Sequence, residues 1–327
     1  MNKDTENKLL LELPDDAMRQ YIDATAAFSA LEEAREQASQ VRGGMYWHKG
    51  PRHAPEQEYL VRTNTAGAEK SLGSRSPETE QLYASFMQRK TAAQERLSGL
   101  KKAVEKHQRL NRALRVGRVA TVVVKLLNRL AESQLGEHFR VVGTHALYAY
   151  EAAAGVRFDD GTLATRDIDL LWDVRRRVAF ATALRRIDSS MLGVLRKVDS
   201  TFRVRDSQKY TAVNKDGFEV DIIRREQAED DPHPVRRSDH EDDFWVAQAP
   251  RAKELLGATP FSAVIVATNG EMARMNTLEP WAFAQFKRWM SNLEDREPLK
   301  KRRDALQAQA VEHVVREYLP QWDRFLE

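Results

Sequence analysis

Apolar positions recur in two different patterns along this chain, and the change falls near Phe139. Before it, apolar side chains such as Met18, Ile22 and Phe28 are spaced as on one face of a helix. After it, short apolar runs of strand length alternate with helical segments. The pattern predicts a mostly helical N-terminal module, a mixed core, and a C-terminal part made of a loop, a hairpin and helices. These three parts span residues 1–136, 137–225 and 226–327.

The N-terminal module is predicted to hold three helices around one β-hairpin. The pair Gly43-Gly44 ends the first helix, while Ser76 as N-cap and Pro77 at the first helical position start the second, with Gly99 as a candidate break. The turn-like "NTAG" between "EYLVRT" and "AEKSLG" predicts the hairpin, at about residues 45–72. The helices are expected over residues 15–42, 77–115 and 119–133.

The core is predicted to alternate strands with helices. Strands are expected in "FRVVG", "DIDLLWD", "TFRVRD", "KYTAVN" and "FEVDIIR", and helices in "THALYAYEAAAG" and "RRRVAFATALRRID". Beyond the core, the polar residues 226–243 show no periodicity and predict a mobile loop. A second hairpin is expected around Asn269-Gly270, and two helices, each begun by a Glu-Pro pair, finish the chain.

Composition narrows the class of protein without naming it. A chain of 327 residues has room for two domains, or for one domain with a helical extension. Cysteine is absent, which excludes disulfides, thiol catalysis and cysteine-ligated zinc. The start of the chain lacks the apolar core of a signal peptide, and no apolar run is long enough to span a bilayer. We therefore expect a cytoplasmic protein without membrane contact.

The stretch "TRDIDLLWD" places two acids one residue apart in a predicted strand. Because side chains alternate along a strand, Asp167 and Asp169 share one face, opposite Ile168 and Leu170. Two carboxylates held this close repel each other unless a cation or hydrogen bonds offset the repulsion. Mg²⁺ suits this role, because it favours one or two carboxylates completed by water and phosphate oxygens. The alternative interpretation is a solvated turn acid beside a helix-capping acid.

Two further features share the core with this acid pair. In "VVGTHAL", Gly143 allows a tight turn, and Thr144 stands at the start of a helix, where backbone amides attract phosphate. In "GFEVDIIRR", Asp221 can supply a third carboxylate, with Glu219 on the same face as a substitute. The alternatives are an ordinary strand-to-helix turn and a half-exposed strand.

Together these motifs resemble the nucleotidyltransferase superfamily typified by DNA polymerase β. The family pattern is an hG[ST] turn, an hDhDh strand and a third acid on a neighbouring strand; here it reads "VVGTHAL", "RDIDLLW" and "EVDII", over roughly residues 139–225. The usual Gly-Ser is Gly-Thr in this chain. The resemblance implies an α+β fold: a small mixed sheet flanked by helices, preceded by the N-terminal helical module with its hairpin and completed by the C-terminal helices.

The form "TRDIDL" and the C-terminal segment more narrowly resemble bacterial nucleotidyltransferases related to abortive-infection and toxin–antitoxin systems. In such relatives a Lys, an Arg and a later basic–acidic pair complete the site. Carried over by position, the Lys is Lys287 and the Arg is Arg296. The pair maps to Lys300 or Lys301 with Asp304, although Arg303 could equally take the basic role. The alternative is a solvated face on a basic helix.

The resemblance implies a magnesium-dependent mechanism. Asp167, Asp169 and Asp221 would bind two Mg²⁺ ions, or Mn²⁺ in their place, under the triphosphate of ATP or another nucleoside triphosphate. Asp221 would also help to deprotonate an acceptor hydroxyl. Several other residues are expected to hold the nucleotide or to neutralise the leaving pyrophosphate: Gly143, Thr144, Arg166, Lys287, Arg303 and Asp304. For Arg166 the alternative is an ion pair with Asp173.

The function expected from these residues is transfer of a nucleoside monophosphate to an acceptor hydroxyl, with release of pyrophosphate. Basic residues in segment 96–118 and in the predicted hairpin favour an RNA or tRNA end as the acceptor, and a protein hydroxyl is the alternative acceptor. The hairpin cations are Lys49, Arg52, His53, Arg62 and Lys70. The alternative function is a non-catalytic nucleic-acid- or protein-binding module of a toxin–antitoxin system. Retention of all three acids and of the Gly turn favours the enzyme.

Overall fold

The computed structural model describes most of the chain. The described residues are 10–50, 56–65, 67–163, 165–173, 175, 177–187, 189–226 and 246–323. They form two compact units: residues 19–110 make one, and residues 1–18 together with 111–327 make the other. The domain boundaries expected at residues 136 and 225 stay predictions.

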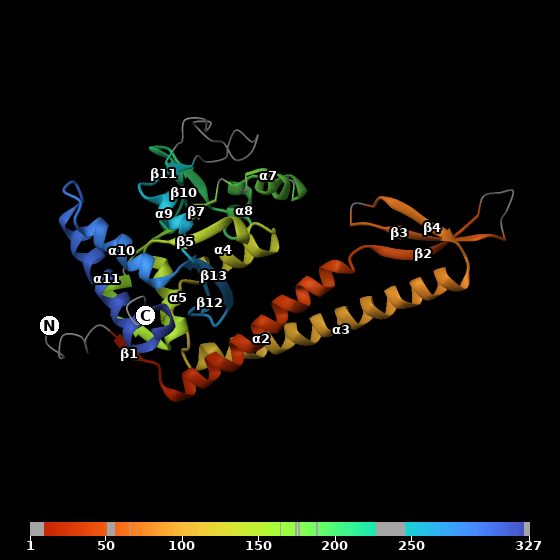
Figure 1. Cartoon of the computed structure of the whole chain (residues 1–327), viewed down its shortest axis with the longest axis horizontal. Coiled ribbons are helices and arrows are strands. Elements are labelled where there is room, and N and C mark those ends of the chain that lie inside the picture. The colour runs from red at the N-terminus through yellow and green to blue at the C-terminus, as the bar shows by residue number, and fades with distance from the viewer. Residues whose placement is uncertain are drawn as a thin grey trace. The chain divides into compact units, whose positions relative to one another are not determined.

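The unit of residues 19–110 is built on two long helices, α2 (Asp15–Gln40) and α3 (Pro77–Ala113), which lie side by side (Figure 1). Ser76 and Thr79 exchange side-chain to backbone hydrogen bonds of 2.8 and 3.3 Å at the start of α3, as the N-cap prediction requires. Gly99 does not break α3, which is continuous across it.

Three strands connect the two helices: β2 (Gly44–Lys49), β3 (Glu58–Thr63) and β4 (Glu69–Ser74). They pair antiparallel in the order β2-β3-β4, so the predicted hairpin is present as β3–β4 and gains β2 at its other edge. Leu60 on β3 and Met45 on β2 pack with Phe86 of α3 in a small core. Burial of these apolar side chains holds the sheet on the helix.

The other unit is centred on a mixed sheet with strand order β5-β7-β10-β9-β8. β7 runs antiparallel to β5 and parallel to β10, and β11 pairs with β10 away from this path. The predicted strands are confirmed, and the two-residue strand β11 is an addition. The bounds are β5 (Phe139–Val142), β7 (Asp167–Trp172), β8 (Arg203–Arg205), β9 (Gln208–Val213), β10 (Glu219–Arg224) and β11 (Ala247–Gln248).

Helices and two short ribbons surround this sheet (Figure 1). The helices are α4 (Thr121–Glu132), α5 (Leu147–Ala154), α6 (Asp160–Leu163), α7 (Arg177–Arg186), α8 (Met191–Arg196), α9 (Ala252–Gly257), α10 (Pro280–Ser291) and α11 (Pro298–Tyr318). Short 3-10 turns are η1 (Gly136–His138), η2 (Thr144–Ala146) and η4 (Pro320–Trp322). The ribbons are β12 (Pro260–Val266) with β13 (Met272–Leu278), and β1 (Leu10–Glu12) with β6 (Val156–Phe158).

The sheet and helices share one large apolar core, in which Trp172, Tyr150 and Phe283 are fully buried. The prediction of an α+β fold, a small mixed sheet flanked by helices, is confirmed. Beyond Glu226, the loop predicted at residues 226–243 lies outside the described residues. Within the described part of the chain, no helix has both the length and the apolarity needed to cross a bilayer.

Candidate active site

The acid pair lies on β7 as the strand pattern predicts. Ile168 and Leu170 are fully buried on the core side, and the acids alternate with them. The parallel register of β7 and β10 pairs Asp169 with Asp221. Residues paired in this way point to the same face of a sheet. Three carboxylates, from Asp167, Asp169 and Asp221, therefore gather on one face although Asp221 is more than fifty residues away along the chain.

Gly143 lies directly against this group of carboxylates. It follows β5, whose last residue, Val142, pairs with Asp169. Its φ of 69° lies in the left-handed region that favours glycine, and a Cβ built on it would collide with Oδ2 of Asp169. The turn thus brings backbone up to the acidic face with no side chain in between. Thr144, the next residue, is buried and begins the 3-10 turn η2 that leads into α5.

Neighbouring acids raise the pKa of Asp169 and that of Asp221. The pKa of Asp169 rises to about 7, first because the group is buried and then because Asp167 and Asp221 are negatively charged; Lys287 and Arg296 oppose this rise. The pKa of Asp221 is also raised, mainly by burial, although the Thr211 hydroxyl donates a 2.5 Å hydrogen bond to it. Charge at this site is therefore under-compensated by the protein's own cations.

A hard divalent cation fits this donor set by charge and by chemistry. The Thr165 hydroxyl donates to one oxygen of Asp167, and the Thr211 hydroxyl donates to one oxygen of Asp221, which orients both carboxylates. Among the described residues, the second oxygen of each carboxylate has no hydrogen-bond partner. Carboxylate oxygens are the ligands that Mg²⁺ and Mn²⁺ prefer. Among the described residues, no group of three or more acidic or histidine side chains lies in positions that could hold a metal ion without rearrangement. The site has the ligands for a cation but not a preformed cage.

His145 supports Asp167 from the core side, a role that the sequence did not reveal. Its Nδ1 lies 2.9 Å from the backbone oxygen of Asp167. Because a carbonyl oxygen only accepts, Nδ1 must carry a proton there. Burial lowers the pKa of His145 to about 4, so the ring is neutral near pH 7. The only sequence signal was its position directly after Gly143-Thr144.

Glu219, the substitute acid, is engaged elsewhere. Its carboxylate forms an ion pair with Arg205 of β8, and it pairs in register with Asp167. Its backbone N–H donates to the backbone oxygen of Arg166 at 2.9 Å. The Arg166 side chain is exposed and forms no hydrogen bond or ion pair with other described residues, so the alternative pair with Asp173 is not formed; Asp173 instead pairs with Arg175.

The C-terminal helices supply a second charged cluster. Lys287 of α10 donates to Oδ1 of Asp304 on α11 at 2.8 Å, and Arg296 donates to Oδ2 of the same carboxylate at 2.8 and 3.0 Å. Burial lowers the pKa of Lys287, and the charge of Arg303 lowers it further, against the opposing effects of Asp304 and Asp169. The positive charge of Lys287 thus lowers the pKa of Asp169, while Lys287 itself is paired with Asp304.

The other basic candidates on α11 contact different groups. Lys300 pairs with Glu297 at 3.3 Å, and Lys301 donates to the backbone oxygen of Glu294 at 3.2 Å. The structure therefore places Arg296, and neither of these lysines, on Asp304.

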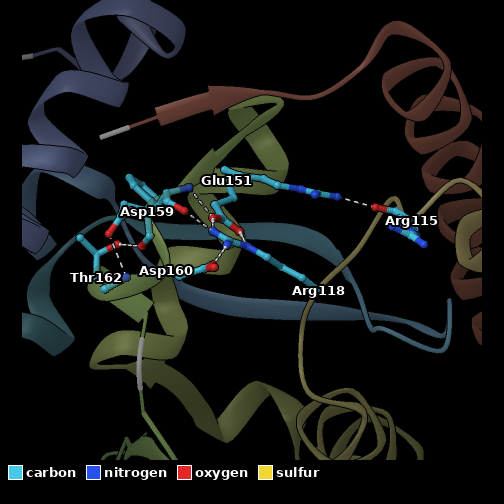
Figure 2. Close-up of polar contacts among 9 residues, drawn as sticks. Arg115, Arg118, Glu151, Asp159, Asp160 and Thr162 are labelled. Atoms are coloured by element: carbon cyan, nitrogen blue, oxygen red, sulfur yellow. Dashed lines mark hydrogen bonds and ion pairs between the residues drawn. The ribbon is translucent and has the colours of Figure 1, made fainter. Parts of the chain in front are cut away.

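A half-buried arginine, Arg118, holds the segment that leads into β7 in place. Arg118 donates to Glu151 of α5, to Asp160 of α6 and to the backbone oxygen of Phe158 (Figure 2). Glu151 in turn accepts a 2.6 Å hydrogen bond from the backbone N–H of Phe158. The backbone oxygen of Asp159 accepts from the hydroxyl of Thr162 at 2.5 Å. These contacts hold α6 in place just before the acid pair.

Fold and site define an α+β protein whose mixed sheet presents three carboxylates beside a glycine turn. A family model described as Nucleotidyltransferase matches residues 121–324, which is more than half of the chain. The chain therefore belongs to this nucleotidyltransferase family and is an enzyme that transfers nucleotidyl groups. No curated protein and no solved structure matches the chain.

Proposed function

We propose that the enzyme transfers a nucleoside monophosphate from a nucleoside triphosphate, ATP being the first candidate, to an acceptor hydroxyl in a magnesium-dependent reaction. Pyrophosphate is the second product. The observation that carries the proposal is the register of β7 and β10, which pairs Asp169 with Asp221. The backbone of Gly143 lies directly against the Asp169 carboxylate. A group of carboxylates whose charge is only partly compensated, next to a backbone turn without a side chain, suits a cation that bridges to phosphate.

Each residue has a part in the proposed reaction. Asp167, Asp169 and Asp221 would hold two Mg²⁺ ions, or Mn²⁺, which supply charge neutralisation at the triphosphate when bound. The turn at Gly143 and Thr144 holds the β and γ phosphates. Asp221, whose pKa is raised, takes up the proton of the acceptor hydroxyl as the new O–P bond forms and pyrophosphate leaves.

Cations outside the carboxylate group assist the leaving pyrophosphate. Lys287 and Arg296 oppose the rise in the pKa of Asp169, which supports a role for their positive charge at the acidic face. Asp304 anchors both cations by accepting hydrogen bonds from them. Arg166 is exposed and has no described partner to compete with a phosphate, so it is available for a direct contact.

For the acceptor we favour an RNA end, such as that of tRNA, over a protein hydroxyl. Four of the exposed cations of α3 lie within an arc of about 140° by helical geometry. His107, which contacts Gln20 of α2 at 3.1 Å, lies outside that arc. The cations are Lys101, Lys102, Lys106 and Arg109.

These α3 cations form no ion pairs with the described residues, and a stripe of this kind matches a phosphate backbone. Not all predicted RNA contacts gain support. Arg62 stacks on Phe86 at 4.1 Å and donates to the backbone oxygen of Arg42 at 3.0 Å, which is a structural role. Arg52 and His53 lie outside the described residues.

The test is transfer of label from each α-³²P nucleoside triphosphate, with Mg²⁺, to total tRNA or to lysate protein. Asp167→Ala/Asp169→Ala serves as the control. We expect label on tRNA with wild type and none with the double variant. Label on protein alone would replace the RNA acceptor by a protein acceptor, and label on neither pool would overturn both acceptors.

The proposed setting is the cytoplasm, where nucleoside triphosphates and RNA are available. The proposed relation to toxin–antitoxin systems predicts that expression of wild type slows growth while expression of Asp167→Ala/Asp169→Ala does not. Equal growth of both strains at equal protein levels would speak against a toxin.

A further inference from the structure

Gln307 of α11 is a fully buried polar side chain that joins two parts of the site from the C-terminal helix. Its Nε2 donates to the hydroxyl oxygen of Thr144 at 3.1 Å and to the backbone oxygen of Thr162 at 2.7 Å. Gln307 is 0 % exposed and Thr144 is 5 % exposed. One amide nitrogen therefore bridges the phosphate turn and α6, which are far from it in sequence.

The chemistry of these contacts settles the orientation of the amide. A carbonyl oxygen can only accept, so the atom 2.7 Å from the Thr162 oxygen must be the NH₂ group of Gln307. The two N–H groups are then directed to Thr162 and Thr144. The other amide atom, Oε1, is buried and has no hydrogen-bond partner among the described residues. An unpaired buried acceptor is unfavourable for stability, so this glutamine is poorly explained by packing alone.

The orientation of the Gln307 amide determines where the hydroxyl proton of Thr144 can point. Its oxygen accepts from Gln307, which can only donate through Nε2, so the hydroxyl proton must point to another acceptor. Thr144 makes no other side-chain hydrogen bond among the described residues. It adjoins Gly143, whose backbone borders the Asp169 carboxylate. A phosphate oxygen at this turn would receive that proton.

The second contact acts on the acid pair. Thr162 belongs to α6; its hydroxyl donates to the backbone oxygen of Asp159, and Arg118 pairs with Asp160 of the same helix (Figure 2). The chain from α6 enters β7 at Asp167. Gln307 thus couples the C-terminal helix to both the phosphate turn and the segment that carries the first metal-binding acid.

We propose that Gln307 is a positioning residue of the nucleotide site, which directs the Thr144 hydroxyl proton towards a phosphate of the bound triphosphate. This inference rests on the proposed function, because the ligand at the turn is the nucleotide. Gln307 itself does not touch the nucleotide; it acts through Thr144.

The test is a double-mutant cycle read by calorimetric binding of ATP with Mg²⁺. Gln307→Met keeps the length of the side chain and removes both donors, and Thr144→Val removes the hydroxyl. Loss of one hydrogen bond to a charged group weakens binding about tenfold or more, so each single variant should show that loss. The double variant should bind within about twofold of Thr144→Val, because Gln307 has no effect once the hydroxyl is gone.

Gln309→Met is the matched control, since Gln309 is an exposed glutamine on the same helix and should bind as wild type does. Melting curves accompany every variant. If Gln307→Met does not fold, Gln307→Glu is measured instead; its carboxylate would accept the Thr144 proton, so binding must weaken.

Losses that add in the double variant, or a Gln307 variant that binds ATP as wild type does, would overturn the inference. Absence of ATP binding by folded wild type is a different result, which overturns the proposed function itself.

Discussion

Asp169 on β7 and Asp304 on α11 are two carboxylates in opposite electrostatic surroundings. Asp304 is fully buried and is contacted by two cations, Lys287 at 2.8 Å and Arg296 at 2.8 Å. The charges that act most strongly on Asp169 are those of two further acids, Asp167 and Asp221, and burial together with these charges raises its pKa to about 7. Folding pairs the Asp304 carboxylate with two cations and leaves the charge of Asp169 only partly compensated.

This difference separates structural from chemical roles. A buried carboxylate with two cationic partners holds those partners in place, and its removal would leave their charges unpaired. A carboxylate among acids is unfavourable until a cation arrives, which is what a metal site requires. Four predictions test whether the two clusters differ in this way.

The largest effect is expected at Asp169. Asp169→Asn keeps the shape of the side chain and removes the charge that a cation needs, so nucleotidyl transfer should fall by at least about a thousandfold. Initial rates of label transfer measure this. Melting curves check that the variant is folded, and a rate within tenfold of wild type would show that Asp169 is not part of the reaction.

The next effect is on stability, at Asp304. Asp304→Ala leaves Lys287 and Arg296 without their shared partner, and should lower the free energy of unfolding by about 3–5 kcal/mol. Urea denaturation measures the loss. Glu297→Ala is the control, because it breaks an exposed pair with Lys300 and should change stability by no more than about 1 kcal/mol. Equal effects of the two substitutions would contradict the structural role of Asp304.

A smaller effect is expected at the glycine turn, where a matched control exists. Gly143 and Gly217 both have positive φ, 69° and 77°, but only a Cβ at Gly143 meets the Asp169 carboxylate. Both alanine variants should lose about 1–3 kcal/mol through backbone strain. Only Gly143→Ala should also lower transfer, by about a hundredfold, because it displaces Asp169. Equal activity of the two variants, compared at equal folded fraction, would remove the turn from the site.

The smallest effect is a pair of opposed pH dependences. The folded pKa of Asp169, about 7, exceeds its ordinary value of 3.8, so the folded state retains a proton that the unfolded state has lost. Its contribution to stability therefore falls as pH rises from about 4 to about 7. The folded pKa of His145, about 4, lies below 6.5, so its contribution rises over nearly the same range.

The two contributions can be separated by mutation. Relative to wild type, Asp169→Asn should gain stability as pH rises through this range, and His145→Gln should lose it. Urea denaturation at intervals between pH 4 and pH 7.5 measures both slopes. Added Mg²⁺ should reduce the slope that comes from Asp169, and should have no such effect in Asp169→Asn. Parallel pH profiles for the two variants would show that one of the two burial environments is misassigned.

Much of the fold could be predicted because its signals are local. Strand alternation in "RDIDLLW" already separates the acids from Ile168 and Leu170, and the Ser76-Pro77 pair marks the start of α3. Shorter elements were missed, including α8, α9 and the ribbon of β1 with β6. A strand of three residues carries too little pattern to recognise, and only its partner makes it a strand.

The residues of the candidate site also fall into two groups, those that local sequence reveals and those that depend on contacts in space. Gly143, Asp167 and Asp169 are recognisable from sequence because the backbone conformation and the strand face depend on near neighbours. His145 and Gln307 are not, because their role depends on which groups meet them in space. Gln307 contacts a hydroxyl 163 residues away. Likewise, helical spacing did not show that Asp304 would be shared by Lys287 and Arg296.

The sequence by itself determined the nucleotidyltransferase motifs, the positions of the core strands along the chain and the glycine that the turn requires. These depend on side-chain periodicity and backbone freedom, which act over a few residues. Only the tertiary structure decided that Asp304 is paired with two cations and that Asp169 lies beside two other acids. Electrostatic interaction depends on distance through space and on burial, and neither is written in the spacing of residues along the chain.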